Sequence, residues 1–191
     1  MRRRAFILTA LAMGLGRPAF AKGARGLVIH DSPIPVPALD IRDAESKPAG
    51  LDLLAGKPVL LNLWASWCMP CIAELPALDR LKPGLEAKGV ALVALSLDRS
   101  GKIAVANTFA RLGIKALDIR TDETRSAAEK LQAPALPVTL LIDRQGREIG
   151  RFIGAAEWDG AEASRLLDAL ASGARLTPDM APPPVKVGTA P

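Results

Sequence analysis

The 191-residue sequence contains no tyrosine, only one histidine and only two cysteines. Because aromatic residues make up just 4% of the chain, Leu, Val, Ile and Ala have to fill most of its core. A zinc centre usually needs four protein ligands, and beyond the one cysteine pair the sequence offers a single histidine and no second pair. Zinc is therefore disfavoured, and neither a metal nor a cofactor is expected.

The sequence also has little excess charge once its first residues are set aside. The whole chain carries +5, but residues 1–21 hold four arginines and no acidic residue, so removing these four charges from +5 leaves +1. Without a basic patch, a nucleic acid is not an expected partner.

The N-terminus has the three parts of a secretory signal. Arg2, Arg3 and Arg4 precede a short apolar stretch, and Ala19-Phe20-Ala21 follows as a small-x-small cleavage site. The pair Arg3-Arg4 also resembles a twin-arginine export signal. We predict a signal peptide over residues 1–21; the alternative is an uncleaved terminus that anchors the protein in a membrane. Either way, an exported or periplasmic location is expected.

The remaining chain divides by composition into three parts. Residues 22–36 are rich in glycine and proline, which predicts a linker, and they contain His30, the single histidine. Residues 37–174 have enough apolar residues for one domain. Residues 175–191 contain five prolines and little apolar periodicity, so we expect a disordered tail.

Apolar patterning predicts alternating strands and helices within the domain. Strands are predicted at 59–64, 90–97, 116–119, 138–142 and 147–153, with a turn over 143–146 joining the last two. Helices are predicted at 69–82, 102–112, 124–131 and 159–171, while residues 39–54 form a short hairpin or loop. Pro76 should kink the first helix, and Pro83-Gly84 should end or interrupt it. This order predicts an α/β fold with a mixed central sheet flanked by helices on both faces.

Both cysteines lie in one motif, Trp67-Cys68-Met69-Pro70-Cys71, which follows a buried strand and opens a helix. Free N–H groups and the helix dipole favour a thiolate at Cys68, which is expected to be exposed and nucleophilic. Cys71 lies one turn later, shielded but close enough to attack a mixed disulfide formed at Cys68. The sequence therefore predicts a redox-active dithiol.

Two plainer interpretations of the cysteines remain beside the redox one. A purely structural disulfide would close too small a loop to restrict the unfolded chain much. A chance pair of buried thiols is the second alternative, but export favours oxidation chemistry over a reduced structural thiol.

The residues around the dithiol resemble a known family. Residues 64–71, Trp-Ala-Ser-Trp-Cys-Met-Pro-Cys, resemble the thioredoxin active site, and their extension over residues 72–76 is similar to the TlpA/ResA/DsbE branch of exported thioredoxin-like proteins. Residues 136–146, which begin Leu-Pro-Val-Thr, resemble the second motif of that branch. The resemblance covers roughly residues 37–171 and implies a thioredoxin-like fold.

The resemblance also implies roles for particular residues. Pro137 matches a cis-proline that helps to present backbone to an extended substrate, with Leu136 before it. Trp67 and Pro70 would border the dithiol on the substrate side. Glu74 matches a glutamate that influences thiol protonation, although a glutamate near a helix start is also simply favourable to the helix dipole.

Asn62, Trp64 and Trp158 are three further positions of interest. Asn62 stands where thioredoxin has a buried aspartate, so the usual proton acceptor is missing and Glu74 is the best substitute. Trp64 is interpreted as core packing, and for Trp158 no role beyond packing is derived.

The implied activity is dithiol–disulfide exchange that reduces exported partners, such as apocytochrome c or a copper-assembly protein. A membrane thiol donor of the DsbD/CcdA type would have to re-reduce the protein, because the periplasm has no thiol buffer. The alternatives are a disulfide oxidant or isomerase, a Cu(I)-binding chaperone that uses both cysteines, and a redox-inactive adaptor.

Overall fold

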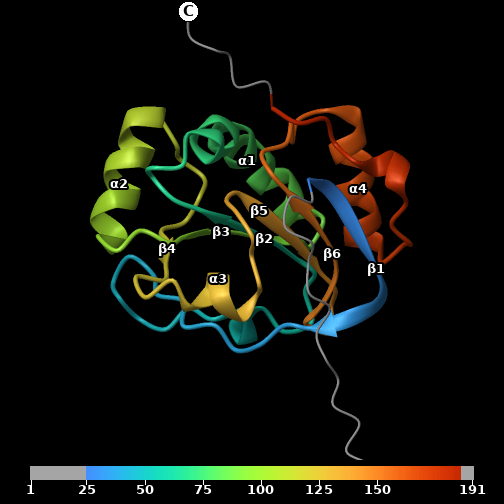
Figure 1. The fold of residues 1–191 in the computed structure, drawn as a ribbon, viewed down its shortest axis with the longest axis horizontal. Coiled ribbons are helices and arrows are strands. Elements are labelled where there is room, and N and C mark those ends of the chain that lie inside the picture. Colours follow the sequence, from blue (N-terminus) through green and yellow to red (C-terminus); the bar gives the residue numbers. More distant parts are fainter. Residues whose placement is uncertain (1–24, 186–191) are drawn as a thin grey trace, which may run out of the picture.

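The computed structural model describes residues 25–185, and within them a six-stranded mixed sheet forms the centre of the protein (Figure 1). The predicted signal peptide lies outside the described residues. The strand order is β1-β6-β5-β2-β3-β4. The strands are β1 (Gly26–Pro35), β2 (Val59–Trp64), β3 (Ala91–Ser96), β4 (Arg120–Thr121), β5 (Val138–Ile142) and β6 (Arg147–Ile153).

Strand β2 lies in the middle of the sheet and leads directly to the cysteine motif. It pairs parallel with β3 and antiparallel with β5, and all six of its residues are buried. A strand covered on both faces needs a nearly continuous apolar run. The apolar run over residues 59–64 predicted this strand with the bounds that the structure shows. The predicted turn over residues 143–146 is also confirmed, because Gly146 N donates to Asp143 O where β5 turns into β6.

Helices cover both faces of the sheet, as predicted. Helices α1 (Met69–Ala87), α2 (Gly101–Leu112) and α4 (Ala161–Ser172) share one hydrophobic core with one face. The short helix α3 (Ser126–Lys130) and the segment around the 3-10 helix η1 (Leu51–Leu54) pack on the other face. Figure 1 shows α1 above the sheet, α2 to its left, α4 to its right and α3 below it.

The prediction of a linker over residues 22–36 is wrong for the described part of that range. Gly26–Pro35 forms β1, which pairs antiparallel with β6, with a register shift between Ile29 and Ile34. Prolines and an irregular register are tolerated because β1 is an edge strand, which needs hydrogen bonds on one side only. His30 therefore lies in the sheet, where its side chain is almost buried.

The prediction of a disordered tail is also wrong as far as residue 185. Leu176 is buried in the core beside α4, and residues 178–180 form the 3-10 helix η2 (Pro178–Met180). Farther along, Val185 N donates to Ala155 O at 3.0 Å. A few apolar anchors thus order a proline-rich segment whose composition alone indicated disorder. Residues 186–191 lie outside the described part of the chain.

Two predicted elements differ from the structure by more than two residues at one end. Helix α1 continues through Pro83 to Ala87, because Leu85 in the added turn is buried in the core. The strand predicted at 116–119 is instead β4, two residues long, which pairs with the end of β3. Packing against the core outweighs the hydrogen bond that Pro83 cannot donate.

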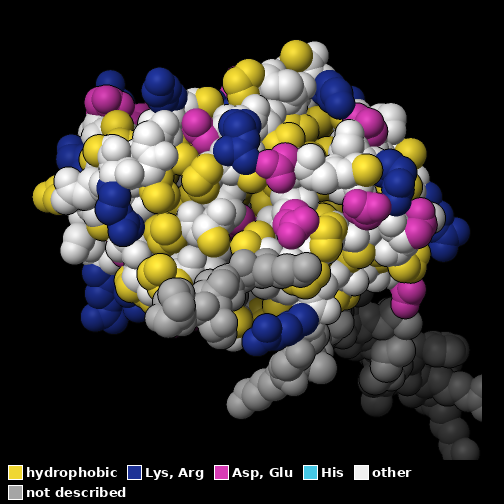
Figure 2. Space-filling model, turned by 90° about the horizontal axis from the view of Figure 1, so that it is seen from above, with side chains coloured by type: hydrophobic (Ala, Val, Ile, Leu, Met, Phe, Trp, Pro, Cys, Tyr) yellow, Lys and Arg dark blue, Asp and Glu magenta, His cyan; other side chains and the backbone are white. Residues whose placement is uncertain are grey.

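The surface mixes charges of both signs. On the side seen in Figure 2, basic and acidic side chains are interspersed with small groups of hydrophobic ones. Within residues 25–185, no helix combines the length and the apolar character needed to cross a bilayer.

Candidate active site

Cys68 and Cys71 form a disulfide at the start of α1, with a Cα–Cα distance of 5.3 Å. Strand β2 ends at Trp64, a tight turn follows in which Cys68 N donates to Ala65 O, and Cys68 is then the N-cap of α1. Its backbone is extended, and its Sγ accepts a hydrogen bond from Cys71 N at 3.3 Å. A backbone N–H at a helix start therefore points at the first sulfur, as predicted for a cysteine whose thiolate is to be stabilised.

Cys68 is less exposed than the sequence predicted. In the disulfide form its relative exposure is 6%, against 0% for Cys71, so the expectation of an exposed Cys68 is wrong for this state. Its neighbours Trp67 and Met69, exposed at 58% and 65%, line the same hollow as Cys68. The order of the two cysteines is nevertheless as predicted, with Cys68 the more accessible one.

Cys68 opens onto a hollow of about 470 Å³. The hollow brings together three of the residues predicted to contact substrate, namely Trp67, Pro70 and Leu136. The fourth, Pro137, lines an adjoining hollow of about 850 Å³ that Pro70 and Leu136 share. The Leu136–Pro137 peptide bond is cis, as the resemblance implied.

Asp98, which no residue pattern singled out, fixes the turn between β2 and the dithiol. Its carboxylate accepts from Ser66 N at 2.8 Å and from Ser66 Oγ at 2.7 Å. Ser96, at the end of β3, donates to the same carboxylate at 2.8 Å. The only sequence signal was an acidic residue just after a buried strand. The contacts hold the turn that presents Cys68.

Glu74 lies on the same helix as the dithiol and is buried, with 1% exposure. Its Oε1 accepts from Asn62 Nδ2 at 2.8 Å, and its Oε2 accepts from Ala156 N at 3.0 Å and from Trp158 Nε1 at 2.9 Å. Because it lies three positions after Cys71, the two side chains are neighbours on one face of α1. Its carboxylate points into the core and contacts residues outside α1. The alternative that Glu74 serves only to interact with the helix dipole does not account for these contacts.

Burial raises the pKa of Glu74 to about 7, above its ordinary value of 4.5. Removing a carboxylate from water disfavours its charged form, and the three hydrogen bonds from Ala156, Trp158 and Asn62 offset only part of that cost. Among the described residues no positive side chain forms an ion pair with it. A carboxyl group of this acidity can take up and release a proton near neutral pH.

Asn62 connects Glu74 to the sheet. Its Nδ2 donates to Glu74 and also to Thr139 Oγ1 on β5, at 2.9 Å. Within residues 25–185 its Oδ1 has no hydrogen-bond partner. The position that holds an aspartate in thioredoxin therefore serves here to orient the glutamate. Trp158, for which only packing was predicted, is a second direct partner of Glu74.

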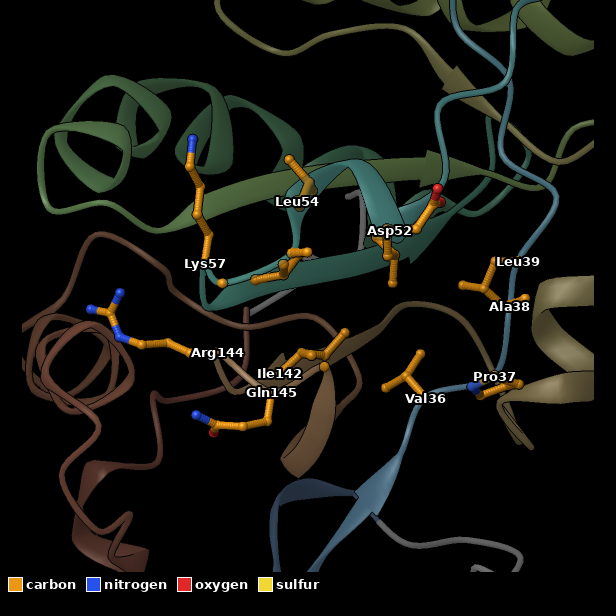
Figure 3. A pocket seen from close by; sticks show the side chains of 15 residues that line it. Val36, Pro37, Ala38, Leu39, Asp52, Leu54, Lys57, Ile142, Arg144 and Gln145 are labelled. Carbon is orange, nitrogen blue, oxygen red and sulfur yellow. The ribbon is translucent and has the colours of Figure 1, made fainter.

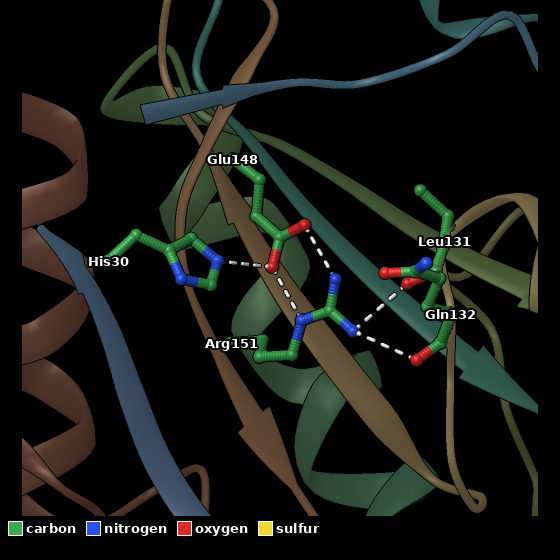
Figure 4. A network of polar contacts seen from close by, with 5 residues as sticks. All are labelled: His30, Leu131, Gln132, Glu148 and Arg151. Atoms are coloured by element: carbon green, nitrogen blue, oxygen red, sulfur yellow. Dashed lines mark hydrogen bonds and ion pairs between the residues drawn. The ribbon is translucent and has the colours of Figure 1, made fainter. Parts of the chain in front are cut away.

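A buried ionic network supports the loop that leads to Leu136 (Figure 4). Arg151 on β6 forms a two-pronged ion pair with Glu148, and its Nη1 donates to Leu131 O at 3.0 Å. His30 Nε2 lies 2.8 Å from Glu148 Oε1, so this nitrogen carries the proton that the carboxylate accepts. Although burial alone would raise it, the hydrogen bonds from His30 and Arg151 hold the pKa of Glu148 below its usual value.

Another cavity, of about 450 Å³, lies far from the dithiol (Figure 3). Val59 at the beginning of β2 lines it, whereas the cysteines follow the end of that strand. Lys57 and Arg144 stand at its rim, and it contains no cysteine or histidine. In the part of the chain from 25 to 185, no three His, Cys, Asp or Glu side chains gather in a way that could hold a metal ion.

Comparison with known proteins points to one group. The family model described as Redoxin matches residues 31–170. The thiol-disulfide oxidoreductase ResA of Bacillus thuringiensis (strain Al Hakam) is 35% identical over 118 residues, which cover 62% of this chain and 67% of that protein. ResA of Bacillus subtilis (strain 168) is 29% identical over 152 residues, covering 78% and 84%.

Solved structures share the fold. A protein of Chlorobium tepidum described as a DsbE-type thiol:disulfide interchange protein superposes with a TM-score of 0.66 at 23% identity, covering 74% of this chain and 98% of that one. A secreted thiol-disulfide isomerase of Corynebacterium glutamicum gives a TM-score of 0.62 at 18% identity, covering 80% and 96%. At these identities the likeness concerns the thioredoxin-like fold.

Proposed function

This chain belongs to the Redoxin family, among the thioredoxin-like thiol–disulfide oxidoreductases, and from that premise we propose that it is an exported reductant of disulfides in other proteins. Thiol–disulfide exchange itself follows from the family and from the Cys68–Cys71 pair. The observation that carries the proposal is the placement of this pair, with Cys68 at a helix start, facing an open hollow, and Cys71 fully buried behind it.

The reaction begins from the reduced dithiol. The Cys68 thiolate attacks a disulfide of the partner, forms a mixed disulfide through Cys68 Sγ and releases one partner sulfur as a thiolate. Cys71 then loses its proton and attacks Cys68 Sγ, which releases the second partner sulfur. The protein gives up two electrons and ends as the Cys68–Cys71 disulfide seen in the structure, and the partner gains two electrons.

Glu74 is the group that accepts the proton of Cys71 in this scheme. Cys71 is fully buried, so its thiol needs a base inside the protein, and the neighbouring carboxyl has a pKa of about 7. A base with that acidity is half-ionised near neutral pH and can pass the proton on after exchange. Asn62 and Trp158 hold the carboxyl in place by hydrogen bonds.

The reducing direction and the setting are parts of the proposal that the resemblance supports. A signal-like N-terminus and relatives of the ResA type favour action outside the cytoplasm. Apocytochrome c and copper-assembly proteins are the candidate partners. Because the surroundings are oxidising, a membrane thiol donor of the DsbD/CcdA type would return two electrons after each turnover.

The direct test is to trap the partner. With Cys71→Ser, the mixed disulfide at Cys68 cannot be resolved, so exported proteins should accumulate covalently bound and be released by dithiothreitol. Cys68→Ser is the matched control and should trap none. The in vivo redox state distinguishes direction: a mostly reduced dithiol supports a reductant, and a mostly oxidised one supports an oxidant. If nothing is trapped and the purified dithiol reduces no disulfide, including insulin, the proposal is wrong.

A further inference from the structure

The hollow beside Cys68 contains one charged side chain, that of Arg125. The other lining residues are apolar or uncharged: Trp67, Cys68, Met69, Pro70, Leu97, Ala128, Ala133, Ala135 and Leu136. No carboxylate lines it, so the cation has no counter-charge within the hollow. A partner segment that docks there while its disulfide is attacked meets one positive charge against an apolar wall.

Arg125 is held in place from two sides. Its backbone has a φ of 64° at the N-cap of α3, and its Nε donates to Leu97 O at 2.9 Å. Its guanidinium lies 5.4 Å from the centroid of the Trp67 ring, within the range of a cation–π contact. Trp67 immediately precedes Cys68, so the charge is fixed next to the attacking sulfur.

The donors of this guanidinium are only partly used. Its Nε is bonded to Leu97, and in the described residues neither Nη1 nor Nη2 has a hydrogen-bond partner. Two adjacent terminal amino groups form the planar fork that binds a carboxylate with two parallel hydrogen bonds. Arg125 is half-buried, so such a bond would be less screened by water than one on an open surface.

The apolar wall adds a second requirement. Ala128, Ala133 and Ala135 are small, which leaves the hollow its volume of about 470 Å³, inside the range of roughly 300–1,000 Å³ typical of ligand pockets. Together with Leu97 and Leu136 they offer a surface that a large aliphatic or aromatic side chain can cover. The hollow thus combines an apolar site and a carboxylate site within reach of one sulfur.

From this combination we infer that the protein selects partner cysteines flanked by a large apolar residue and an acidic residue, with Arg125 as the specificity-determining side chain. The inference rests on the proposed function, because it concerns the substrate of the same dithiol. It assigns Arg125 a contact with the substrate and no part in the exchange of electrons.

The test uses short cyclic disulfide peptides that are identical except at one position. Each carries a leucine beside the attacked cysteine, followed by Glu, Gln or Lys. The reduced protein is mixed with each peptide, and its oxidation is followed by the protein's tryptophan fluorescence. The second-order rate constant of this oxidation is then compared between peptides. We expect the Glu peptide to react roughly fivefold faster than the Gln peptide, the size of a partly exposed ion pair, and the Lys peptide to be slowest. High salt should reduce the difference.

Variants separate this role from others. Arg125→Met keeps the aliphatic stem against Trp67 and should bring the Glu and Gln rates within twofold of each other. Arg125→Lys keeps the charge without the fork and should give an intermediate preference. Arg111→Met removes an exposed arginine that does not line the hollow and should keep the full preference, which controls for net charge.

Three results would overturn the inference. Equal rates for the Glu and Gln peptides with the unaltered protein would show that no acidic residue is selected. Equal slowing of all peptides by Arg125→Met would show that Arg125 acts on the dithiol or on the fold. Reduction of insulin without reduction of any peptide would remove the inference and leave the proposed function standing, whereas failure with insulin as well would remove both.

Discussion

The indole Nε1 of Trp158 donates a hydrogen bond of 2.9 Å to Oε2 of Glu74, joining the segment before α4 to the helix that begins at the dithiol. Both side chains are buried, and they are separated by 84 positions in the sequence. The contact places a neutral donor, and no positive charge, against a carboxyl whose pKa is near 7. Because the pKa of Glu74 is raised in the folded protein, its protonation should be measurable through the free energy of unfolding as well as through the rate of disulfide exchange.

Glu74 should make the stability of the protein depend on pH. Below about pH 4.5 the group is protonated in both the folded and the unfolded chain. Between 4.5 and about 7 the unfolded chain releases the proton while the folded chain keeps it, so the free energy of unfolding falls as pH rises. The loss should total roughly 3 kcal/mol, at about 1.4 kcal/mol per pKa unit, and end above pH 7.

Urea unfolding of the oxidised protein at a series of pH values measures this loss. Glu74→Gln cannot titrate, so its stability should lack this part of the pH dependence, while the remaining groups titrate as before. Parallel pH profiles for the two proteins would show that Glu74 has an ordinary pKa.

Trp158→Phe should weaken the hold on the ionised carboxyl. The variant removes one of three donors, so the pKa of Glu74 should rise further and the protein should lose about 1–3 kcal/mol where Glu74 is charged. Trp64→Phe is a matched control, because Trp64 is equally buried but its Nε1 has no hydrogen-bond partner in the described chain. Urea titrations at pH 8 and pH 5 should show a pH-dependent loss for Trp158→Phe only, and an equal loss at both values would contradict this account.

Arg151→Met should be strongly destabilising. The variant leaves Glu148 buried and without the cation that pairs with it through two hydrogen bonds, which typically costs about 3–5 kcal/mol. The double variant Arg151→Met/Glu148→Leu leaves no charge stranded at that position and should lose less. Thermal unfolding of both variants tests the comparison. A double variant that is no more stable than the single one would show that the cost comes from lost packing.

Leu176→Ala should be costly although the residue lies in the range predicted to be disordered. Leu176 is 5% exposed and belongs to the core beside α4, so the truncation should cost about 2–4 kcal/mol. Leu53→Ala, at a position 69% exposed, is the control and should change stability by less than about 0.5 kcal/mol. If denaturant midpoints shift equally, Leu176 is not anchored in solution.

The elements next to the dithiol could be predicted because local rules decide them. The apolar run of β2 has to be buried on both faces, and a cysteine that follows it at a helix start is placed by the chain itself. The helix predicted from the sequence ended before Pro83 because a local rule about proline was used. In the structure α1 continues past Pro83, because burial of Leu85 decides where it ends. For the same reason β1 was missed, since pairing with β6 orders a segment that composition describes as a linker.

The polar support of the site was harder to predict because it joins distant positions. Asn62 and Glu74 were both singled out, but the sequence carries no signal that Trp158 or Ala156 N would reach the same carboxyl. Asp98 was missed for the same reason, since its partner Ser66 lies 32 positions away, after the end of a different strand. Such contacts depend on strand order and register, which residue patterns do not specify.

Neither border of the sheet offers a good template for another extended chain. On one side β4 has only two residues, and on the other β1 carries a register shift and the prolines Pro33 and Pro35. Sheets with long regular borders tend to polymerise through strand addition. If the protein exchanges disulfides with exported partners as proposed, it can therefore engage them at its hollow without exposing a long strand edge to which their chains could add.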